Sequence, residues 1–220
     1  MVIEFEKQKW SQGENFIAGL DEVGRGCLAG PLVTAVVILN KEHFSNLEKD
    51  RNNDVYSELI ENYSQIKDSK LLSKTKREQL SEFISKNSIE YNVSVISWLD
   101  VDKFGIARAT QNSFEQNIDS LKSKVDHFFV DAFKIKKFED SKQTNIIKGD
   151  NKSITIAAAS IIGKVYRDSL MEEYAKMYPI YEFENNKGYG TKLHMEKIRE
   201  HGICEIHRKS FEPIKTMLNL

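Results

Sequence analysis

The hydrophobic positions of the chain fall first into two short apolar runs on either side of a glycine-rich link. Residues 16–20 read FIAGL and residues 32–39 read LVTAVVIL. The first run is too short for a helix and contains a glycine, while the second is rich in β-branched side chains. We therefore predict two buried strands joined by the link at residues 21–31.

Two later segments also have the pattern of strands. Apolar and polar side chains alternate over residues 89–96, which predicts a third strand that completes a meander with the first two. The short segment HFFV at residues 127–130 is almost wholly apolar and predicts a fourth strand, directly before Asp131.

The remaining apolar positions recur at helical spacing. Residues 1–15 carry mixed charge, with Phe5 and Trp10 as expected anchors onto the core, and are assigned no element. Residues 45–67 are polar and are expected to form a loop and then a short helix. The predicted helices run over residues 55–63, from a cap at Ser73 or Thr75 to Ile84, over 106–121 and 153–176, and from the cap Thr191 to His201.

Length and charge narrow the class of protein. The 220 residues suit one α/β domain, residues 1–177, with a C-terminal helical appendage, residues 178–220. Lys and Arg number 32 against 33 Asp and Glu, and the net charge of -1 argues against indiscriminate coating of nucleic acid. Seven Lys or Arg against four Glu within residues 187–215 nevertheless predict a modest basic face there.

Cysteine content and hydropathy indicate a cytoplasmic protein. Cys27 and Cys204 are too few for a disulfide framework, and we interpret both as reduced packing residues. The N-terminus lacks the basic-then-apolar order of a signal peptide, and no apolar run approaches the roughly 20 residues that span a bilayer.

The link at residues 21–31 carries the candidate chemistry, because it opens on two adjacent carboxylates, Asp21 and Glu22. Its glycines suggest a dinucleotide-binding turn, but that motif requires a helix to follow, and a strand is predicted instead. A plain hairpin turn would not explain two acids at the end of a buried strand. Neighbouring residues of a strand point to opposite faces, so the two acids are expected to share a site only if the strand bulges or ends between them.

Two further acids occupy comparable places. Asp131 ends the predicted strand at 127–130, and functional residues of open α/β sheets gather beyond strand ends. Asp150 precedes the predicted helix at 153–176, where an acid can also serve merely to stabilise the helix dipole. Asp168 lies one turn after Lys164 and is interpreted as its ion-pair partner.

The sequence DEVGRG at residues 21–26, with AGP at 29–31, closely resembles the signature of the bacterial type 2 ribonuclease H family, ribonuclease HII. Other motifs of that family recur in the right order and cover nearly the whole chain. They are DSK at 68–70, VD at 130–131, KGD at 148–150, AAASI at 157–161, KV at 164–165 with RD at 167–168, GYGT at 188–191 and HRKSF at 207–211.

The resemblance implies a fold and an activity. The fold would be ribonuclease H-like α/β, with a central mixed sheet of five strands, helices on both sides and a C-terminal helical segment. The activity would be endonucleolytic hydrolysis of the RNA strand of RNA/DNA hybrids, and nicking on the 5′ side of single ribonucleotides in duplex DNA. The products would be a 3′-hydroxyl and a 5′-phosphate, formed by a protein that acts as a monomer.

The resemblance also assigns residues. Asp21, Glu22, Asp131 and Asp150 would be the catalytic residues and the ligands of two metal ions. Mg²⁺ or Mn²⁺ suits an all-oxygen site, whereas zinc would call for Cys or His. The substrate contacts would be Gly24, Arg25, Gly26, Lys70, Ser160, Lys164, Tyr189, His207 and Arg208.

Alternatives remain open on sequence grounds. Lys70 and the basic stretch at 207–209 could be solvated surface charges. The same fold could serve a metal-dependent DNA nuclease of the resolvase kind, which needs no ribose reader. A non-catalytic nucleic-acid-binding protein is disfavoured by the four acids, because a pure binder gains from losing negative charge near phosphates.

Overall fold

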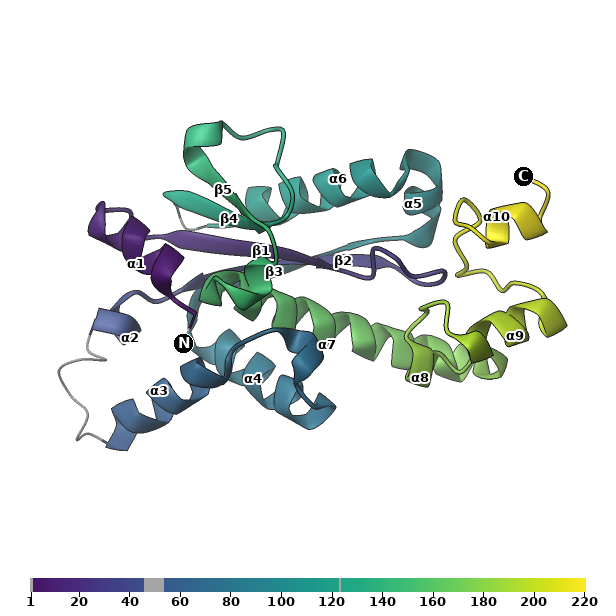
Figure 1. Ribbon diagram of the computed structural model, residues 1–220, viewed down its shortest axis with the longest axis horizontal. Helices are drawn as coiled ribbons and strands as arrows, with labels where there is room; N and C mark the ends of the chain where they lie inside the picture. Colours follow the sequence, from purple (N-terminus) through teal and green to yellow (C-terminus); the bar gives the residue numbers. More distant parts are fainter. Residues whose placement is uncertain (1, 46–53, 123) are drawn as a thin grey trace.

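A single mixed sheet organises the protein, as the computed structural model shows for residues 2–45, 54–122 and 124–220 (Figure 1). Its strands lie in the order β3-β2-β1-β4-β5. They are β1 (Ile17–Val23), β2 (Leu32–Leu39), β3 (Ser88–Ile96), β4 (His127–Asp131) and β5 (Gln143–Ile146). The first three pair antiparallel and the last two join in parallel, so the predicted meander and the five-stranded mixed sheet are confirmed. The short strand β5 has no counterpart among the strands located from the sequence.

Helices cover both faces of this sheet (Figure 1). The longer ones are α1 (Glu4–Ser11), α3 (Asp54–Gln65), α4 (Lys74–Asn87), α5 (Trp98–Phe104), α6 (Ile106–Asp119), α7 (Ile154–Met177) and α9 (Lys192–His201). The short ones are α2 (Glu42–Ser45), α8 (Phe183–Asn186) and α10 (Ile214–Met217). All five predicted helices are present, within two residues at either end except for α4, which runs three residues further. Ser73 rather than Thr75 caps α4 and accepts from the Lys76 amide. Helices α1 and α5 were not expected.

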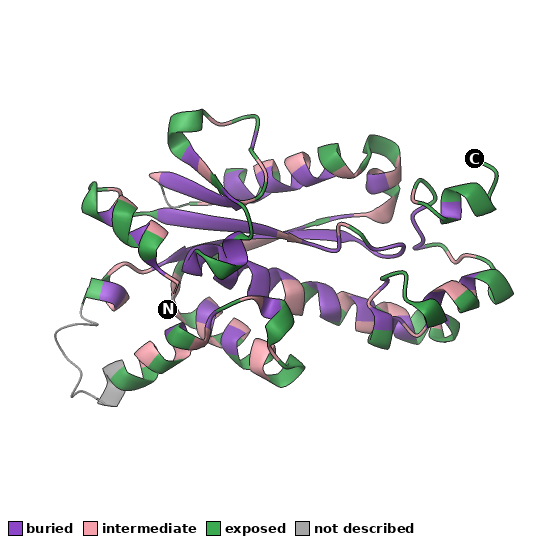
Figure 2. Cartoon of the chain, in the orientation of Figure 1, coloured by how far each residue is buried: buried purple, intermediate pink, exposed green. Residues whose placement is uncertain are grey.

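The alternation of side chains along β2 divides the core into two layers. Ala35, Val37 and Leu39 pack with α7, α4 and α3 on one face. Val36 and Ile38 pack on the other face, with Phe114 of α6. Because every residue of β2 is buried, its apolar run is continuous rather than alternating, as expected for a strand covered on both faces (Figure 2).

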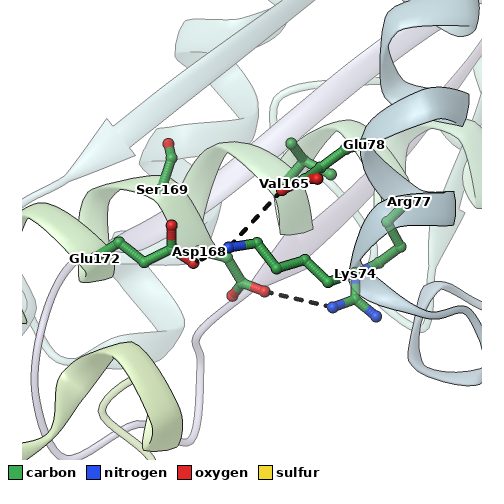
Figure 3. A pocket seen from close by; sticks show the side chains of 7 residues that line it. All are labelled: Lys74, Arg77, Glu78, Val165, Asp168, Ser169 and Glu172. Carbon is green, nitrogen blue, oxygen red and sulfur yellow. Dashed lines mark hydrogen bonds and ion pairs between the residues drawn. The ribbon is translucent and has the colours of Figure 1, made fainter.

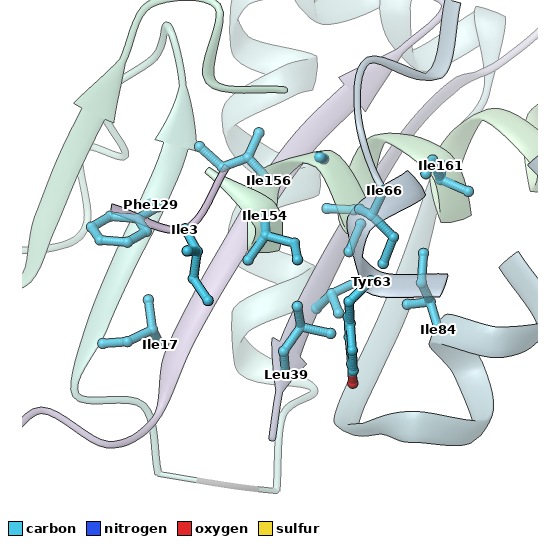
Figure 4. Close-up of a cluster of buried hydrophobic side chains, with 14 of the residues drawn as sticks. Ile3, Ile17, Leu39, Tyr63, Ile66, Ile84, Phe129, Ile154, Ile156 and Ile161 are labelled. Carbon is cyan, nitrogen blue, oxygen red and sulfur yellow. The ribbon is translucent and has the colours of Figure 1, made fainter. Parts of the chain in front are cut away.

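Helix α7 crosses the central strand at close range. A methyl group at Gly19 of β1 would lie 2.1 Å from the Thr155 carbonyl carbon, so only glycine permits this contact. Figure 4 shows isoleucines from the first two turns of α7 meeting Leu39 of β2 and Tyr63 of α3. The N-terminal half of α7 is therefore fixed against the strand that carries Asp21 and Glu22.

The C-terminal segment has a small core of its own. Residues Tyr181, Phe183, Ile198 and Ile206 pack with Met171 near the end of α7. In Figure 1 this segment lies beyond the C-terminal half of α7. Its treatment as a separate unit from residue 178 stays a prediction. Among the described helices, none combines the length and apolar character needed to cross a membrane.

Candidate active site

Asp21 and Glu22 lie within β1, without the expected break between them. Asp21 pairs with Ala35 and Glu22 with Thr34 in unbroken antiparallel register, so the expected bulge or strand end on this side was wrong. On the other side of β1, the parallel pairing with β4 ends at Leu20 and Val130. The sheet opens beyond that pair, which allows both acids to line one cavity.

Asp131 and Asp150 are brought to the same place by a short turn. Asp131 ends β4, and its Oδ1 accepts a hydrogen bond of 2.8 Å from the amide of Gly149. Asp150 follows in a 3₁₀ turn, Gly149–Asn151, directly before α7. Its Oδ2 lies 3.7 Å from the Nζ of Lys70, and its Oδ1 accepts from the side-chain amide of Asn151.

The electrostatics of the four acids indicate uncompensated negative charge. Burial raises the pKa of Asp21 to about 7, with Asp131 and Asp150 adding to the rise, while a hydrogen bond from Ser160 opposes it. Burial, followed by repulsion from Asp21, raises the pKa of Glu22 to about 8. The Oε2 of Glu22 is buried and has no hydrogen-bond partner. A cation in this cavity would relieve both effects.

The donor set suits a hard divalent cation, but the side chains are not arranged around one. Among the described residues, no three His, Cys, Asp or Glu side chains are placed to hold a metal ion as they stand. One oxygen of Asp131 accepts from the Gly149 amide, and the oxygens of Asp150 face the Asn151 amide and the Lys70 ammonium. Carboxylate oxygens are nevertheless the ligands that Mg²⁺ and Mn²⁺ prefer, so the residues present fit such ions once their side chains turn.

The cavity in front of the acids has a volume of about 570 Å³ and is lined by most of the predicted substrate-binding residues. Gly24, Arg25 and Gly26 form one wall, and Lys70, Ser160, Lys164 and Tyr189 contribute from other elements. Asp21, Glu22 and Asp131 line it as well. The structure thus brings together residues that span 168 positions of the sequence, from 21 to 189.

Sequence reasoning missed two polar residues of this cavity, Ser69 and Arg77. The Oγ of Ser69 lies 3.0 Å from the Oγ of Ser160, which in turn hydrogen-bonds Asp21. Arg77 donates to the Ser69 carbonyl and so fixes the DSK turn. Ser69 could have been found because it lies between two motif residues, whereas nothing in the sequence pattern distinguishes Arg77.

A buried arginine organises the loop that follows Glu22. Arg167 of α7 donates to the carbonyls of Ala29 and Pro31 and, at 2.8 Å, to that of Lys187. Gly24 has φ +90°, and a methyl group there would lie 2.1 Å from the Arg167 Nε. The guanidinium therefore joins α7, the glycine-rich loop and the segment before Tyr189 at one point.

The expected contacts of His207 and Arg208 with nucleic acid are wrong in this structure, because both side chains are 0% exposed. Arg208 donates to the carbonyls of Gly30 and Arg25 and supports the glycine-rich loop from behind. His207 faces His194 rather than solvent. The sequence shows that these side chains are basic. It does not show whether they already donate hydrogen bonds to backbone carbonyls inside the fold.

Comparison with known proteins identifies the family. A sequence profile described as ribonuclease HII matches residues 18–214. The chain belongs to this family. The ribonuclease HII of Caldanaerobacter subterraneus subsp. tengcongensis is 44% identical over 207 residues, which cover 94% of this chain and 78% of that protein. That of Clostridium beijerinckii is 46% identical over 210 residues, covering 96% and 72%.

Solved structures show the same fold. The ribonuclease H2 of Pyrococcus horikoshii OT3 superposes with a TM-score of 0.73 at 24% identity, covering 93% of this chain and 97% of that one. Bst-RNase HIII, solved in complex with Mn²⁺, superposes with a TM-score of 0.67 at 17% identity, covering 94% and 70%. The ribonuclease H-like fold that the sequence predicts is confirmed.

Membership of the ribonuclease HII family establishes the activity in outline. The protein is an endoribonuclease that cleaves the RNA of RNA/DNA hybrids and nicks at ribonucleotides embedded in DNA, and the family depends on divalent metal ions. The DNA nuclease and the non-catalytic binder considered from the sequence are thereby excluded.

Tyr189 stands at the far side of the ribonuclease HII cavity from the acids. Its side chain is 39% exposed, and its ring lies 5.8 Å from the Lys164 Nζ and 5.9 Å from the Arg167 guanidinium carbon. Burial of the hydroxyl, with Cys27 close by, raises the pKa of Tyr189 to about 12. The ring thus lies near two cations of α7 and lines the cavity.

A second, smaller hollow of about 50 Å³ lies between α4 and α7 and is filled by ion pairs (Figure 3). Lys74 reaches Glu172 at 2.7 Å, and Arg77 lies 3.8 Å from Asp168. Asp168 also pairs with Lys164 at 2.8 Å, which confirms the predicted ion pair. Its carboxylate is therefore taken up by a structural network, and the hollow has no room for a nucleotide.

Proposed function

We propose that this cavity hydrolyses the phosphodiester on the 5′ side of a ribonucleotide, with Asp21, Glu22, Asp131 and Asp150 holding two Mg²⁺ or Mn²⁺ ions. The observation that carries the proposal is the meeting of four carboxylates at a buried site, where burial and mutual repulsion raise the pKa of Asp21 and Glu22 well above the usual range. Two such ions, when bound, activate water and stabilise the leaving 3′ oxygen.

The chain's own residues position the acids for this role. Ser160 of α7 hydrogen-bonds Asp21 and is itself held by Ser69, so the central acid has a fixed orientation. The Gly149 amide holds one oxygen of Asp131 and leaves the other free. Lys70 lies beside Asp150 with its Nζ exposed, where it can meet a phosphate of the substrate.

Recognition of the ribose is assigned to the two walls that flank the acids. Reading a 2′-hydroxyl separates RNA from DNA, and it requires close approach to the sugar. The backbone of Gly24, Arg25 and Gly26 supports such an approach on one side, and Tyr189 supplies an aromatic ring on the other. Lys164, which lines the cavity near that ring, is placed to neutralise a backbone phosphate.

The substrates are RNA/DNA hybrids and duplex DNA that contains ribonucleotides, and we propose that one copy of the chain acts alone in the cytoplasm. Three carboxylates, the glycine-rich loop and the Tyr189 ring all line the cavity from the same chain. No second copy is needed to complete the cavity.

End-group mapping tests the proposed chemistry. A labelled duplex with one ribonucleotide should be nicked on its 5′ side, giving a 3′-hydroxyl on the DNA fragment and a 5′-phosphate on the ribonucleotide. Cleavage should require Mg²⁺ or Mn²⁺ and stop in excess EDTA, because water rather than the 2′-hydroxyl attacks the phosphorus. A 2′,3′-cyclic phosphate, or cleavage that persists in EDTA, would contradict the proposal.

A further inference from the structure

Two histidines of the C-terminal segment lie next to each other in the interior, away from the cavity surface. His194 of α9 and His207 are both 0% exposed. Their rings pack against Tyr181 and Phe183, with the His207 ring 4.9 Å from that of Tyr181. Burial lowers the pKa of both imidazoles, so both are neutral near pH 7.

The backbone fixes which ring nitrogens of this pair carry hydrogen. The Cys204 amide donates to the Nδ1 of His207 at 2.9 Å, so a neutral His207 carries its hydrogen on Nε2. An Nδ1–H directed at the Cys204 carbonyl, 3.3 Å away, would instead set two hydrogens against each other. At the other end, the Nδ1 of His194 lies 2.8 Å from the Tyr189 carbonyl, which can only accept.

The two assignments agree at the contact between the rings. The Nε2 atoms are 3.1 Å apart, and His207 donates there while His194 accepts. A single directed chain results, from the Cys204 amide through His207 and His194 to the Tyr189 carbonyl. Each histidine donates through one ring nitrogen and accepts through the other, so both rings are fully hydrogen-bonded in a buried site.

This chain of hydrogen bonds ends at Tyr189, the residue proposed to contact the ribose. The Tyr189 carbonyl accepts from the Thr191 amide at 2.8 Å as well as from His194, and the Tyr189 amide donates to Asn186. These bonds fix both peptide planes of Tyr189 and therefore the direction of its side chain. Between two glycines, the backbone would otherwise have unusual freedom.

We propose that His194, with its tautomer set by His207, is a positioning residue that holds the Tyr189 ring against the ribose by fixing its carbonyl. The proposal rests on the role of Tyr189 given above. It explains why a buried, neutral histidine pair occurs in this basic segment.

Two substitutions of His194 separate its hydrogen bond to the Tyr189 carbonyl from its hydrogen bond with His207. His194→Asn keeps an amide donor near the position of Nδ1 and so retains the bond to Tyr189. His194→Gln places its amide near Nε2, keeps an acceptor for His207 and loses the donor to Tyr189. At saturating substrate, His194→Gln should slow cleavage at a single ribonucleotide on the order of tenfold, as expected for one lost hydrogen bond. His194→Asn should stay within about twofold, like the exposed control His201→Asn.

Amide exchange measures the positioning without reference to cleavage. The Tyr189 and Thr191 amides should lose protection in His194→Gln and retain it in His194→Asn, at equal thermal stability. In the unsubstituted protein, a long-range ¹H–¹⁵N imidazole spectrum should show hydrogen on the Nε2 of His207 and on the Nδ1 of His194. This spectrum tests the chain of hydrogen bonds in the unsubstituted protein, so it does not depend on the folding of any variant.

The outcomes are distinguishable from failure of the proposed function. If Tyr189→Ala cleaves at the wild-type rate, the ribose role of Tyr189 is wrong, and exchange protection still decides whether the histidines fix the loop. If Tyr189→Ala is impaired while His194→Gln and His194→Asn behave alike in rate and exchange, the positioning role is overturned. The opposite tautomers in the spectrum would overturn it as well.

Discussion

Two glycines that flank Arg25 are present for different physical reasons. Gly24 has a backbone conformation that side chains rarely adopt, and the Arg167 guanidinium fills the space where a Cβ would lie. Gly26 has no such constraint, since a Cβ there would meet nothing within 4 Å. We therefore attribute the glycine at position 26 to the substrate, which is proposed to approach the backbone at this wall.

This difference predicts opposite phenotypes for two matched substitutions. Gly24→Ala should destabilise the fold by about 2 kcal/mol or more, because it combines a positive φ with a clash in a buried network. Gly26→Ala should leave the free energy of unfolding within about 0.5 kcal/mol and instead weaken cleavage of ribonucleotide-containing duplex. Urea denaturation and steady-state kinetics on both variants check this. Full activity of Gly26→Ala would remove this loop from substrate recognition.

Asp131 offers a clean test of the acid set. Asp131→Asn retains an oxygen to accept from the Gly149 amide, so the fold should be preserved while one negative ligand is lost. Cleavage should fall by at least about a hundredfold, because a metal ion contributes several kcal/mol to such a reaction.

Binding of a hybrid to Asp131→Asn, followed by fluorescence anisotropy, should change little. The exposed Asp140→Asn is the control and should cleave normally. A wild-type rate for Asp131→Asn would show that the catalytic centre has been assigned to the wrong residues.

At the scale of secondary structure, α1 shows what local patterns leave out. Glu6 of α1 is fully buried, and its Oε1 accepts from the Ser153 hydroxyl at 2.6 Å and from the Thr155 amide and hydroxyl. It thereby caps the N-terminus of α7 from 147 residues away in sequence. The spacing around Ser153 predicts where α7 begins, but no local pattern reveals a cap supplied by another helix.

Glu6→Ala should therefore destabilise the protein by about 2 to 4 kcal/mol, since it leaves three buried donors without their acceptor. Glu4→Ala, on the exposed side of the same helix, should change the free energy of unfolding by less than about 0.5 kcal/mol. Chemical denaturation of both variants measures the difference. Equal effects would mean that the cap adds nothing beyond the packing of α1.

Elements that carry long periodic patterns were predictable, and those that depend on a neighbour were not. The buried, mostly apolar run of eight residues in β2 and the 24-residue pattern of α7 are evident from the sequence. Strand β5 has four residues and forms because β4 offers a parallel edge, which the sequence does not display. The four acids were found from motifs, whereas the inward-facing roles of His207 and Arg208 depend on tertiary contacts.

For the whole molecule, buried histidines contribute a loss of stability in acid. Burial, with Lys9 nearby, lowers the pKa of His127 to about 4, and burial next to His194 lowers that of His207 to about 4. The unfolded chain takes up these protons near pH 6.5, so it binds more protons than the folded protein between about pH 6.5 and 4. The histidines' contribution to stability is complete above that window and falls as the pH decreases through it.

Between pH 7 and pH 5 each histidine should contribute a fall of up to about 1 kcal/mol per pH unit, measured by urea denaturation against the opposite contribution of Asp21 and Glu22, whose raised pKa favours the folded state as the pH decreases. His127→Gln should reduce the slope, and the exposed control His201→Gln should not. An unchanged slope in His127→Gln would mean that other groups cause the acid sensitivity.

Helix α7 fixes the distances between several residues that are proposed to meet the substrate. Asp150 precedes it, Ser160 and Lys164 project from its middle, and Arg167 joins it to the loop before Tyr189. The 24 residues form one continuous rod of about 36 Å. If the acids cut and Tyr189 reads the ribose, as proposed, the pitch of the helix sets the distance between these two positions. An irregular duplex would then have to bend in order to reach both.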